Sequence, residues 1–380
     1  MKRRMTRLAL SSFLACAWLS GAAFAKAPDA QGGGPYGSAK TCSPCHTTIH
    51  GYWSESEHSR SATSPAFLES LRAAVDGAVD KEAVRTGCAS CHAPTALVTG
   101  DYRLEQAVTR EGVTCDFCHT VSDIDLRTPG HLFQLEPGPV KRGPLELAKS
   151  PAHDTAYSPL FRASPLLCAS CHQHTNAHGV EVLSTYTEWK AGPYPERGQT
   201  CQECHMPLVP GWSVAEGLGS SQRRINLHRI EGGSATGRLA TGLDLRFDSV
   251  TLRGSAEIDV AVVNRAVGHA APGGLSSKSL VLGVGVDIGS GDLRLRSDRI
   301  YRRALRDEQG RDLVKVADLF LKAAAVGDDT RLRQKETRIE HFTIPLPDNW
   351  VAIVARLEYR DASSGEPKVS LVREVRWERR

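Results

Sequence analysis

The chain has 380 residues, with 47 Lys or Arg against 43 Asp or Glu. Four of the basic residues and no acidic residue lie in the first 25 positions, so the remainder carries 43 charges of each sign. A formally neutral chain lacks the excess positive charge that attracts nucleic acid, and we expect no DNA or RNA partner. The length suits two domains of ordinary size.

Residues 1–25 have the features of a secretory signal peptide. A basic head that ends at Arg7 precedes an apolar stretch, and Ala23-Phe24-Ala25 matches an A-x-A cleavage site. The apolar stretch is too short to span a bilayer. We therefore expect a periplasmic or otherwise exported protein, cleaved after Ala25. Cys16 leaves open a lipidated N-terminus, although the residues before it match a lipoprotein signal poorly, and membrane association would otherwise need a partner.

The other ten cysteines all belong to C-x-x-C-H motifs, of which there are five. The motifs are Cys42, Cys45 and His46; Cys88, Cys91 and His92; Cys115, Cys118 and His119; Cys168, Cys171 and His172; and Cys201, Cys204 and His205. Two thiols three positions apart can form thioethers with the two vinyl groups of one haem, and the His that follows can bind the iron. The sequence therefore predicts five covalently bound haem c groups.

Two alternatives would also use paired cysteines. Zinc ribbons begin with C-x-x-C, and an even number of cysteines in an exported chain is typical of disulfides. Neither requires a His after every second Cys. With 14 His among 380 residues, chance would place one at all five positions with a probability on the order of one in ten million. Haem attachment is therefore the favoured interpretation.

The sequence changes character along its length and predicts an α+β fold. Residues 26–40 are small and polar and read as a flexible leader. Residues 41–232 hold all the motifs, and we expect a mostly helical or irregular multihaem domain wrapped around its haems, with helices over 49–61, 65–79 and 181–190. Residues 233–380 lack cysteine and alternate in polarity, which predicts an antiparallel β-sandwich. Its expected strands are 243–252, 256–263, 279–288, 337–344, 351–359 and 369–377, and a helix over 313–325 is compatible with the pattern.

Nine histidines outside the motifs are candidates for the second axial position of the irons. They are His50, His58, His131, His153, His174, His178, His228, His269 and His341. The sequence does not pair them with particular motifs. His58 follows Trp53 on what reads as one helix, whereas His269 lies in a Gly- and Pro-rich loop between two expected strands. A ligand from that loop would make the β-domain a lid over the haem array.

Several longer motifs resemble a multihaem cytochrome c family. They are Trp53-Ser54-Glu55-Ser56-Glu57-His58-Ser59, Glu111-Gly112-Val113-Thr114 with the third haem motif, Cys201-Gln202-Glu203-Cys204-His205-Met206-Pro207, and the Gly-His-x-x-Pro-x-Gly loop at 268–274. This family is related in haem packing to the tetrahaem electron acceptor of hydroxylamine oxidoreductase and, more distantly, to pentahaem nitrite reductase. The resemblance covers about residues 40 to 290.

The resemblance implies low-spin haems with two axial histidines at most sites, packed in parallel and perpendicular pairs. Matched by motif, His58, His153, His228 and His269 are expected as distal ligands, with His178 as a fifth and His131 and His174 in reserve. If none of these three binds iron, one haem keeps an open position.

Three functions are compatible with the sequence. Iron with imidazole on both faces has no site for a substrate, so we expect an electron carrier that serves other exported redox proteins, and we assign no catalytic residue. The alternative is a multihaem oxidoreductase with one open haem, acting on a small nitrogen or sulfur oxyanion. The sequence lacks the C-x-x-C-K motif expected of the nitrite reductase relatives, which weighs against that alternative. In a third interpretation the β-sandwich is a binding module with an attached electron supply.

Overall fold

The structure is a computed structural model, and it describes residues 34–127, 132–216, 223–232 and 235–379. The predicted signal peptide, Cys16, most of the leader and His131 lie outside the described residues. Within the described part of the chain, no helix is both long enough and apolar enough to cross a membrane.

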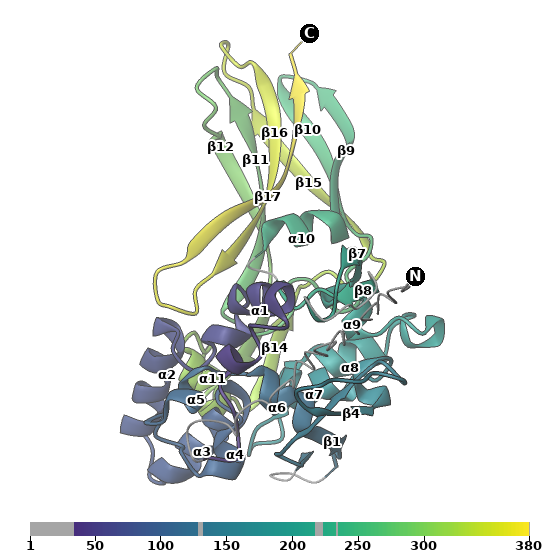
Figure 1. The fold of residues 1–380 in the computed structure, drawn as a ribbon. Coiled ribbons are helices and arrows are strands. Elements are labelled where there is room, and N and C mark those ends of the chain that lie inside the picture. Colours follow the sequence, from purple (N-terminus) through teal and green to yellow (C-terminus); the bar gives the residue numbers. More distant parts are fainter. Residues whose placement is uncertain (1–33, 128–131, 217–222, 233–234, 380) are drawn as a thin grey trace, which may run out of the picture.

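The first part of the chain consists of short helices joined by longer segments (Figure 1). Its helices are α1 (Thr47–Ser54), α2 (Pro65–Asp76), α3 (Lys81–His92), α4 (Ala96–Thr99), α5 (Ala107–Arg110), α6 (Cys115–Thr120), α7 (Leu166–His172), α8 (Thr185–Lys190) and α9 (Cys201–His205). Short 3-10 turns span Ala39–Thr41, His58–Arg60, Pro159–Phe161 and Pro195–Arg197.

Side-chain caps explain where the longer helices begin. Ser64 accepts a hydrogen bond from the backbone N of Phe67 at the start of α2, with Pro65 in the first helical position. Asp80 caps α3 in the same way. The expected helix over 65–79 is therefore confirmed in the main, but that over 49–61 divides into α1 and a separate 3-10 turn that starts at His58.

The first part also contains small sheets that the sequence did not predict. They pair β1 (Val121–Ile124) with β2 (Phe133–Leu135), β3 (Val140–Gly143) with β4 (Asp154–Tyr157), β5 (Gln173–Thr175) with β6 (Glu181–Ser184), and β7 (Leu208–Trp212) with β8 (Arg223–Asn226). The β3–β4 pair is parallel and the others are antiparallel. The prediction of a helix over 181–190 is wrong for its first four residues, because these pair with β5 before α8 begins. Strands of three to five residues are too short to show a clear period-two pattern.

The second part is dominated by two antiparallel sheets, seen at the top of Figure 1. One has the order β15-β10-β9 and the other β12-β11-β16-β17. The strands are β9 (Leu243–Leu252), β10 (Ser255–Asn264), β11 (Lys278–Asp287), β12 (Arg294–Tyr301), β15 (Thr337–Pro345), β16 (Ala352–Asp361) and β17 (Lys368–Glu378). All six expected strands are present, each within two residues of its predicted ends. The sequence missed β12, an edge strand whose arginines obscure the apolar alternation.

The two sheets share one hydrophobic cluster, which includes Ile258 and Val260 from β10 and Leu280, Leu282 and Leu357 from the other sheet. Each of these five side chains is fully buried. Helix α10 (Thr236–Gly242) closes one end of the cluster through Leu239. The mixture of helices with mainly antiparallel sheets confirms the α+β class.

One segment of the second part packs on the first part. It comprises β13 (Arg303–Arg306), α11 (Val316–Lys322) and β14 (Ala325–Asp329), and Figure 1 shows α11 and β14 among the helices of the first part. Leu305 and Leu319 form a buried cluster with Val180 and Val182. The predicted helix over 313–325 is present as the shorter α11. The two halves of the chain therefore share an apolar contact that neither could form alone.

Candidate functional site

A cavity of about 2950 Å³ lies among the helices of the first part and extends to the 268–274 loop of the second. Ordinary small-molecule pockets reach roughly 1,000 Å³, so this space suits several large ligands. Nine of the ten motif cysteines line it, Cys88 being the exception. The histidines that line it are His46, His50, His58, His92, His119, His153, His172, His205, His228 and His269. The structure therefore gathers all five motif histidines and four of the five predicted distal ligands around one space.

The motif cysteines lie on helical turns, which explains their orientation. The second and fourth motifs form the last turns of α3 and α7, and the third and fifth motifs lie in α6 and α9. The first motif immediately precedes α1. Residues three apart on a helix face the same side, so both thiols of a motif are presented together. Thiols of different motifs also lie beside each other, and the interaction with Cys171 lowers the pKa of Cys91 to about 7. The pairs in contact are Cys42 with Cys115, Cys91 with Cys171 and Cys168 with Cys201.

Most of the cavity histidines are oriented by a hydrogen bond to a backbone carbonyl. The Nδ1 atoms donate from His46 to Val214 O (2.6 Å), from His92 to Ser61 O (3.1 Å), from His119 to Arg142 O, from His153 to Asp154 O (2.9 Å), from His205 to Glu231 O (2.8 Å), from His228 to Asn226 O (2.7 Å) and from His269 to Ala270 O (2.9 Å). A carbonyl oxygen only accepts, so Nδ1 carries the hydrogen and Nε2 of the neutral ring keeps a lone pair. This arrangement is typical of histidines that bind a metal through Nε2.

Motif histidines face non-motif histidines at a constant separation. Ring centroids are 6.3 Å apart for His46 and His153, 6.3 Å for His58 and His172, and 6.4 Å for His205 and His269. Metal–imidazole bonds are roughly 2 Å long, so two such bonds and the distances from nitrogen to ring centre add up to about this separation. Each pair could hold one metal atom between its rings.

Electrostatics place a further motif histidine, His119, near the non-motif histidine His228. Burial lowers the pKa of His228 to about 4, and His119 is the next largest cause. The pKa of His172 is also lowered, to about 3, and the causes are the surrounding protein first and the neighbouring His58 second. The residue lines the cavity and is exposed to it. Burial keeps these rings neutral, which is the form that binds metal.

His92 and His119 differ from the other three motif histidines, because a phenyl ring stacks on each of them. Phe67 stacks on the ring of His92 with centroids 4.1 Å apart and an interplanar angle of 13°. In the described residues, no histidine ring faces His92 at the separation of the three pairs. His119 has a similar aromatic neighbour, because Phe161 stacks on it at 5.0 Å. Two phenyl rings thus fix the orientation of two motif histidines.

The position of His58 depends on the segment before the third motif. Val113 N donates to His58 O at 3.0 Å, and Trp53 Nε1 donates to Val113 O at 2.9 Å. Gly112 has a φ of +74°, and a Cβ placed there would lie 2.4 Å from His58 O. Only glycine permits this close approach. The Glu-Gly-Val-Thr motif therefore fixes the backbone that carries His58.

His269 reaches the cavity from the second part of the chain. Asn264 Nδ2 donates to His269 O at 3.3 Å, and a Cβ on Gly273 would lie 2.6 Å from the imidazole. The absence of a side chain at Gly273 leaves room for the ring. The predicted placement of His269 in a loop beside the cavity is what the structure shows.

Three other predicted histidines have different positions. His178 does not line the cavity, and its ring lies 3.9 Å from Glu308. Its turn is held against the second part because Asn176 Nδ2 donates to Ala323 O at 2.7 Å. The geometry therefore gives the expected role of His178 no support. His174 does not line the cavity and packs against Phe320, which does, and His131 lies outside the described residues.

The cavity lining has features that suit haem. Several buried polar atoms of lining residues have no partner within the protein, and haem propionates would supply acceptors for the donors among them. These atoms are Arg142 Nη1, Tyr194 OH, Thr200 Oγ1, Gln202 Oε1 and Tyr359 OH. Among the described residues, no three His, Cys, Asp or Glu side chains gather to hold a metal ion, and the ten motif thiols are all free.

Sequence reasoning missed the residues that support the histidines. Phe67, Phe161 and Arg142 carry no local signal, because each meets its histidine only through the folded chain. The same is true of Glu188, which contacts the backbone beside His269.

Comparisons with known proteins give one family match and one structural match. Residues 41–120 match the family model described as cytochrome c554 and c-prime. A penta-heme cytochrome c552 from Thermochromatium tepidum has a similar structure, with a TM-score of 0.71 and 22% identity over 90% of this chain and 98% of that chain. No curated protein matches the chain. The structural likeness shows a shared fold, and the two matches together support a multihaem cytochrome c with covalently bound haem c.

Proposed function

We propose that this chain is an exported c-type cytochrome with five haems that passes electrons between other exported redox proteins. The cavity lined by all five motif histidines supports the number of haems. The three histidine pairs at 6.3 to 6.4 Å carry the proposal, because such pairs saturate the axial positions of iron and leave outer-sphere electron transfer as the chemistry.

The proposed axial pairs join residues far apart in the sequence. They are His46 with His153, His119 with His228, His172 with His58, and His205 with His269. Haem c, when bound, supplies an iron that changes between the ferric and ferrous states. The protein fixes each imidazole through its Nδ1 bond or its packing, and paired imidazoles favour low potentials.

The contacts between motifs support a continuous path. The first motif contacts the third through Cys42 and Cys115. The fourth motif contacts the second through Cys171 and the fifth through Cys168. The third and fourth motifs are linked by the electrostatic influence of Cys118 on Cys168. We infer the spatial order 1-3-4, with the second and fifth motifs both beside the fourth.

The test is to purify the exported protein, weigh it, and record the electron paramagnetic resonance spectrum of its oxidised form. We expect a mass that exceeds the mature polypeptide by five haems. The spectrum should contain four low-spin ferric species, one for each proposed pair, and one high-spin species. A colourless protein with the mass of the polypeptide alone would contradict the proposal.

A second candidate function follows from the environment of His92. Among the described residues, no histidine ring faces His92 at the separation of the three pairs, and His178 lies outside the cavity, so the second axial position of its haem has no assigned histidine. An open iron could bind a small nitrogen or sulfur oxyanion, as a multihaem oxidoreductase requires. The test adds nitrite or hydroxylamine to the purified protein and measures turnover and the loss of the high-spin signal. Binding without turnover would leave electron transfer as the function.

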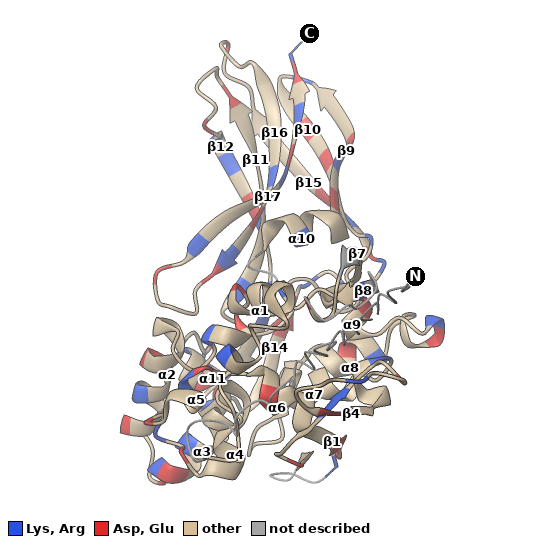
Figure 2. Cartoon of the chain, viewed as in Figure 1, with Lys and Arg blue, Asp and Glu red and all other residues tan. Residues whose placement is uncertain are grey.

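The remaining parts of the proposal concern location and partners. The basic head, apolar stretch and A-x-A site support export with cleavage after Ala25. We infer that the two sheets form a β-sandwich whose 268–274 loop covers the cavity, since they share one hydrophobic cluster. In the view of Figure 2, Lys or Arg and Asp or Glu are interspersed over both parts. Mixed charge suits transient contacts with redox partners rather than with nucleic acid.

A further inference from the structure

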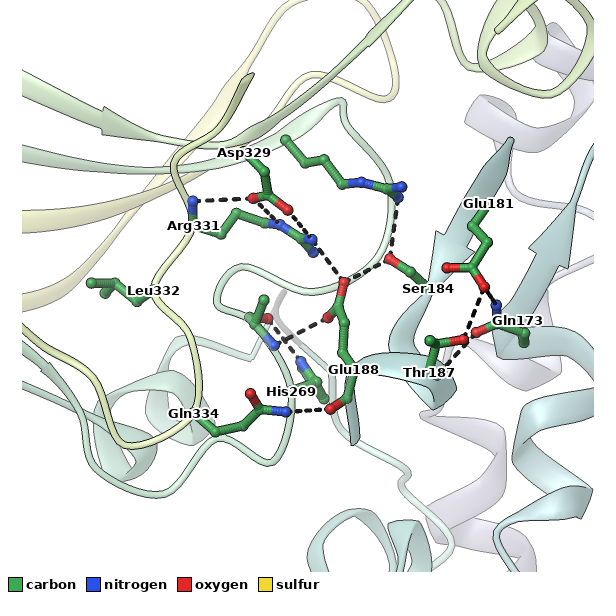
Figure 3. A network of polar contacts seen from close by, with 12 residues as sticks. Gln173, Glu181, Ser184, Thr187, Glu188, His269, Asp329, Arg331, Leu332 and Gln334 are labelled. Carbon is green, nitrogen blue, oxygen red and sulfur yellow. Dashed lines mark hydrogen bonds and ion pairs between the residues drawn. The ribbon is translucent and has the colours of Figure 1, made fainter. Parts of the chain in front are cut away.

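A largely buried carboxylate lies at the junction of the two parts, beside the loop that carries His269 (Figure 3). Glu188 belongs to α8 in the first part of the chain. Its Oε1 accepts hydrogen bonds from Arg331 Nη2 at 2.7 Å and from Ser184 Oγ at 2.6 Å. Its Oε2 accepts from the backbone N of Ala270 at 3.1 Å. One side chain of the first part therefore binds both an arginine and the His269 loop of the second part.

The same residue is tied to the other side of His269. Gln334 Nε2 donates to the backbone O of Glu188 and to Gly268 O, the latter at 3.3 Å. Glu188 and Gln334 together hold the backbone on both sides of His269, at Gly268 and Ala270. The Nδ1 bond from His269 goes to Ala270 O, so the orientation of the ring also depends on this peptide.

The charges at this junction are balanced; the Asp329 side chain is 38% exposed, and the other charged side chains are mostly buried. The Arg331 side chain is 5% exposed and that of Glu188 is 16% exposed. Arg331 also binds Asp329 at 2.7 Å, and Arg303 Nη1 donates to Ser184 Oγ at 3.1 Å. Removing one partner of a buried ion pair leaves the other charge without compensation. The charged groups of this network must therefore keep their positions relative to one another.

A buried ion pair at an interface can serve only to stabilise the contact between the two parts. The bond from Ala270 N to Glu188 Oε2 argues for a more specific role, because the ion pair does not need it. It uses the second carboxylate oxygen for the residue next to His269, whose ring faces His205 at 6.4 Å with an interplanar angle of 8°.

We propose that Glu188 is the positioning residue that sets the His269 ring opposite His205. Packing of the second part on α8 then completes the axial pair of the fifth motif. The spin state of this haem therefore depends on the correct packing of the two parts. The inference rests on the proposed pairing of His205 with His269. It adds a residue that touches neither the haem nor the imidazole.

The test compares three substitutions in the holoprotein by electron paramagnetic resonance of the ferric state. His269→Ala identifies the low-spin signal of the fifth motif, which should become high-spin. Glu188→Ala should lose at least half of that same signal and leave the other low-spin signals unchanged. Glu188→Gln keeps the shape and some acceptor capacity, so it should lose a smaller fraction.

A matched control separates positioning from general destabilisation. Glu358 has a 13% exposed side chain that pairs with Arg296 at 2.8 Å on the sheet, away from the His269 loop. Glu358→Ala should lower thermal stability without changing any haem signal.

Each outcome decides a different point. If His269→Ala leaves the spectrum unchanged, the proposed axial pair is wrong. If His269→Ala removes a signal that Glu188→Ala retains in full, the positioning role is wrong while the pair stands. Should Glu188→Ala fail to fold, Glu188→Gln decides by the same measurement, and an unaltered signal in that variant overturns the proposal.

Discussion

The two parts of the molecule are stabilised by different means. Of the twelve largest fully buried side chains in the described residues, only Val121 precedes residue 243. In the second part, large aliphatic side chains from two sheets form one cluster. In the first part, the buried clusters are smaller, and that of Ala62, Ala89, Ala93 and Ala96 consists of alanines. The first part instead surrounds a cavity of about 2950 Å³.

In the proposed holoprotein, this contrast separates a fold that depends on a cofactor from a fold that does not. Burial of apolar surface drives folding in both, and under the proposed function the first part takes much of that surface from haem. The second part obtains it from its own side chains. The two parts are joined by the apolar contact of Leu305 and Leu319 with Val180 and Val182. The segment that carries Leu305 and Leu319 is therefore expected to follow the first part in stability.

The largest effect should come from preventing haem attachment. We expect the chain produced without haem to lose ordered structure over the described residues before 233, while the two sheets persist. The segment from 303 to 329 should lose protection with the first part, because it packs there. Hydrogen exchange measured by mass spectrometry would map the loss. Equal protection of both parts in the absence of haem would refute the contrast.

A core substitution should have a large effect confined to the second part. Leu282 is fully buried between the sheets, so Leu282→Ala should lower the free energy of unfolding of the holoprotein by about 2–5 kcal/mol. The haem absorption spectrum of the native variant should not change. The control is Leu252→Ala, whose side chain is 43% exposed, and denaturant titration measures both. A shifted spectrum for Leu282→Ala would mean that the sheets determine haem geometry more directly than we propose.

A smaller effect, confined to the first part, is expected from Gly112→Ala. A methyl group there would meet His58 O at 2.4 Å in a backbone conformation with φ of +74°. We expect a loss of about 1–3 kcal/mol and a change in the low-spin signal of the His58–His172 pair. Gly100→Ala is the control, since its φ is +72° but nothing lies within 4 Å of the added carbon. Equal spectra for the two variants would show that His58 tolerates the displacement.

The smallest effect concerns a surface histidine of the second part. A hydrogen bond to Asp259 is the largest cause that raises the pKa of His341, and Glu257 adds to it. A pKa raised by folding stabilises the folded state fully below the ordinary value of about 6.5, and this contribution disappears as the pH rises through the folded pKa. His341→Ala should therefore be slightly less stable than the parent at pH 5 and equal to it at pH 9. Thermal unfolding at the two pH values checks this, and a difference that grows with pH would contradict it.

Several features could be predicted from the sequence because they are local. Thiol pairs and their adjoining histidines depend on covalent spacing alone, so the positions of Cys42 to His205 in five motifs were readable. The six longest strands were readable because one face of each packs on a common cluster, which imposes period-two alternation. His269 could be recognised as a candidate because its loop has a distinctive composition.

Tertiary structure alone decided which histidines face each other. His58 lies opposite the histidine of the fourth motif rather than that of a nearer one, and His178 lies outside the cavity although its sequence setting resembles that of the others. Glu188 meets Ala270 across 82 residues of chain. Such contacts depend on how distant segments pack, and packing energy is shared among many residues. No short stretch of sequence contains it.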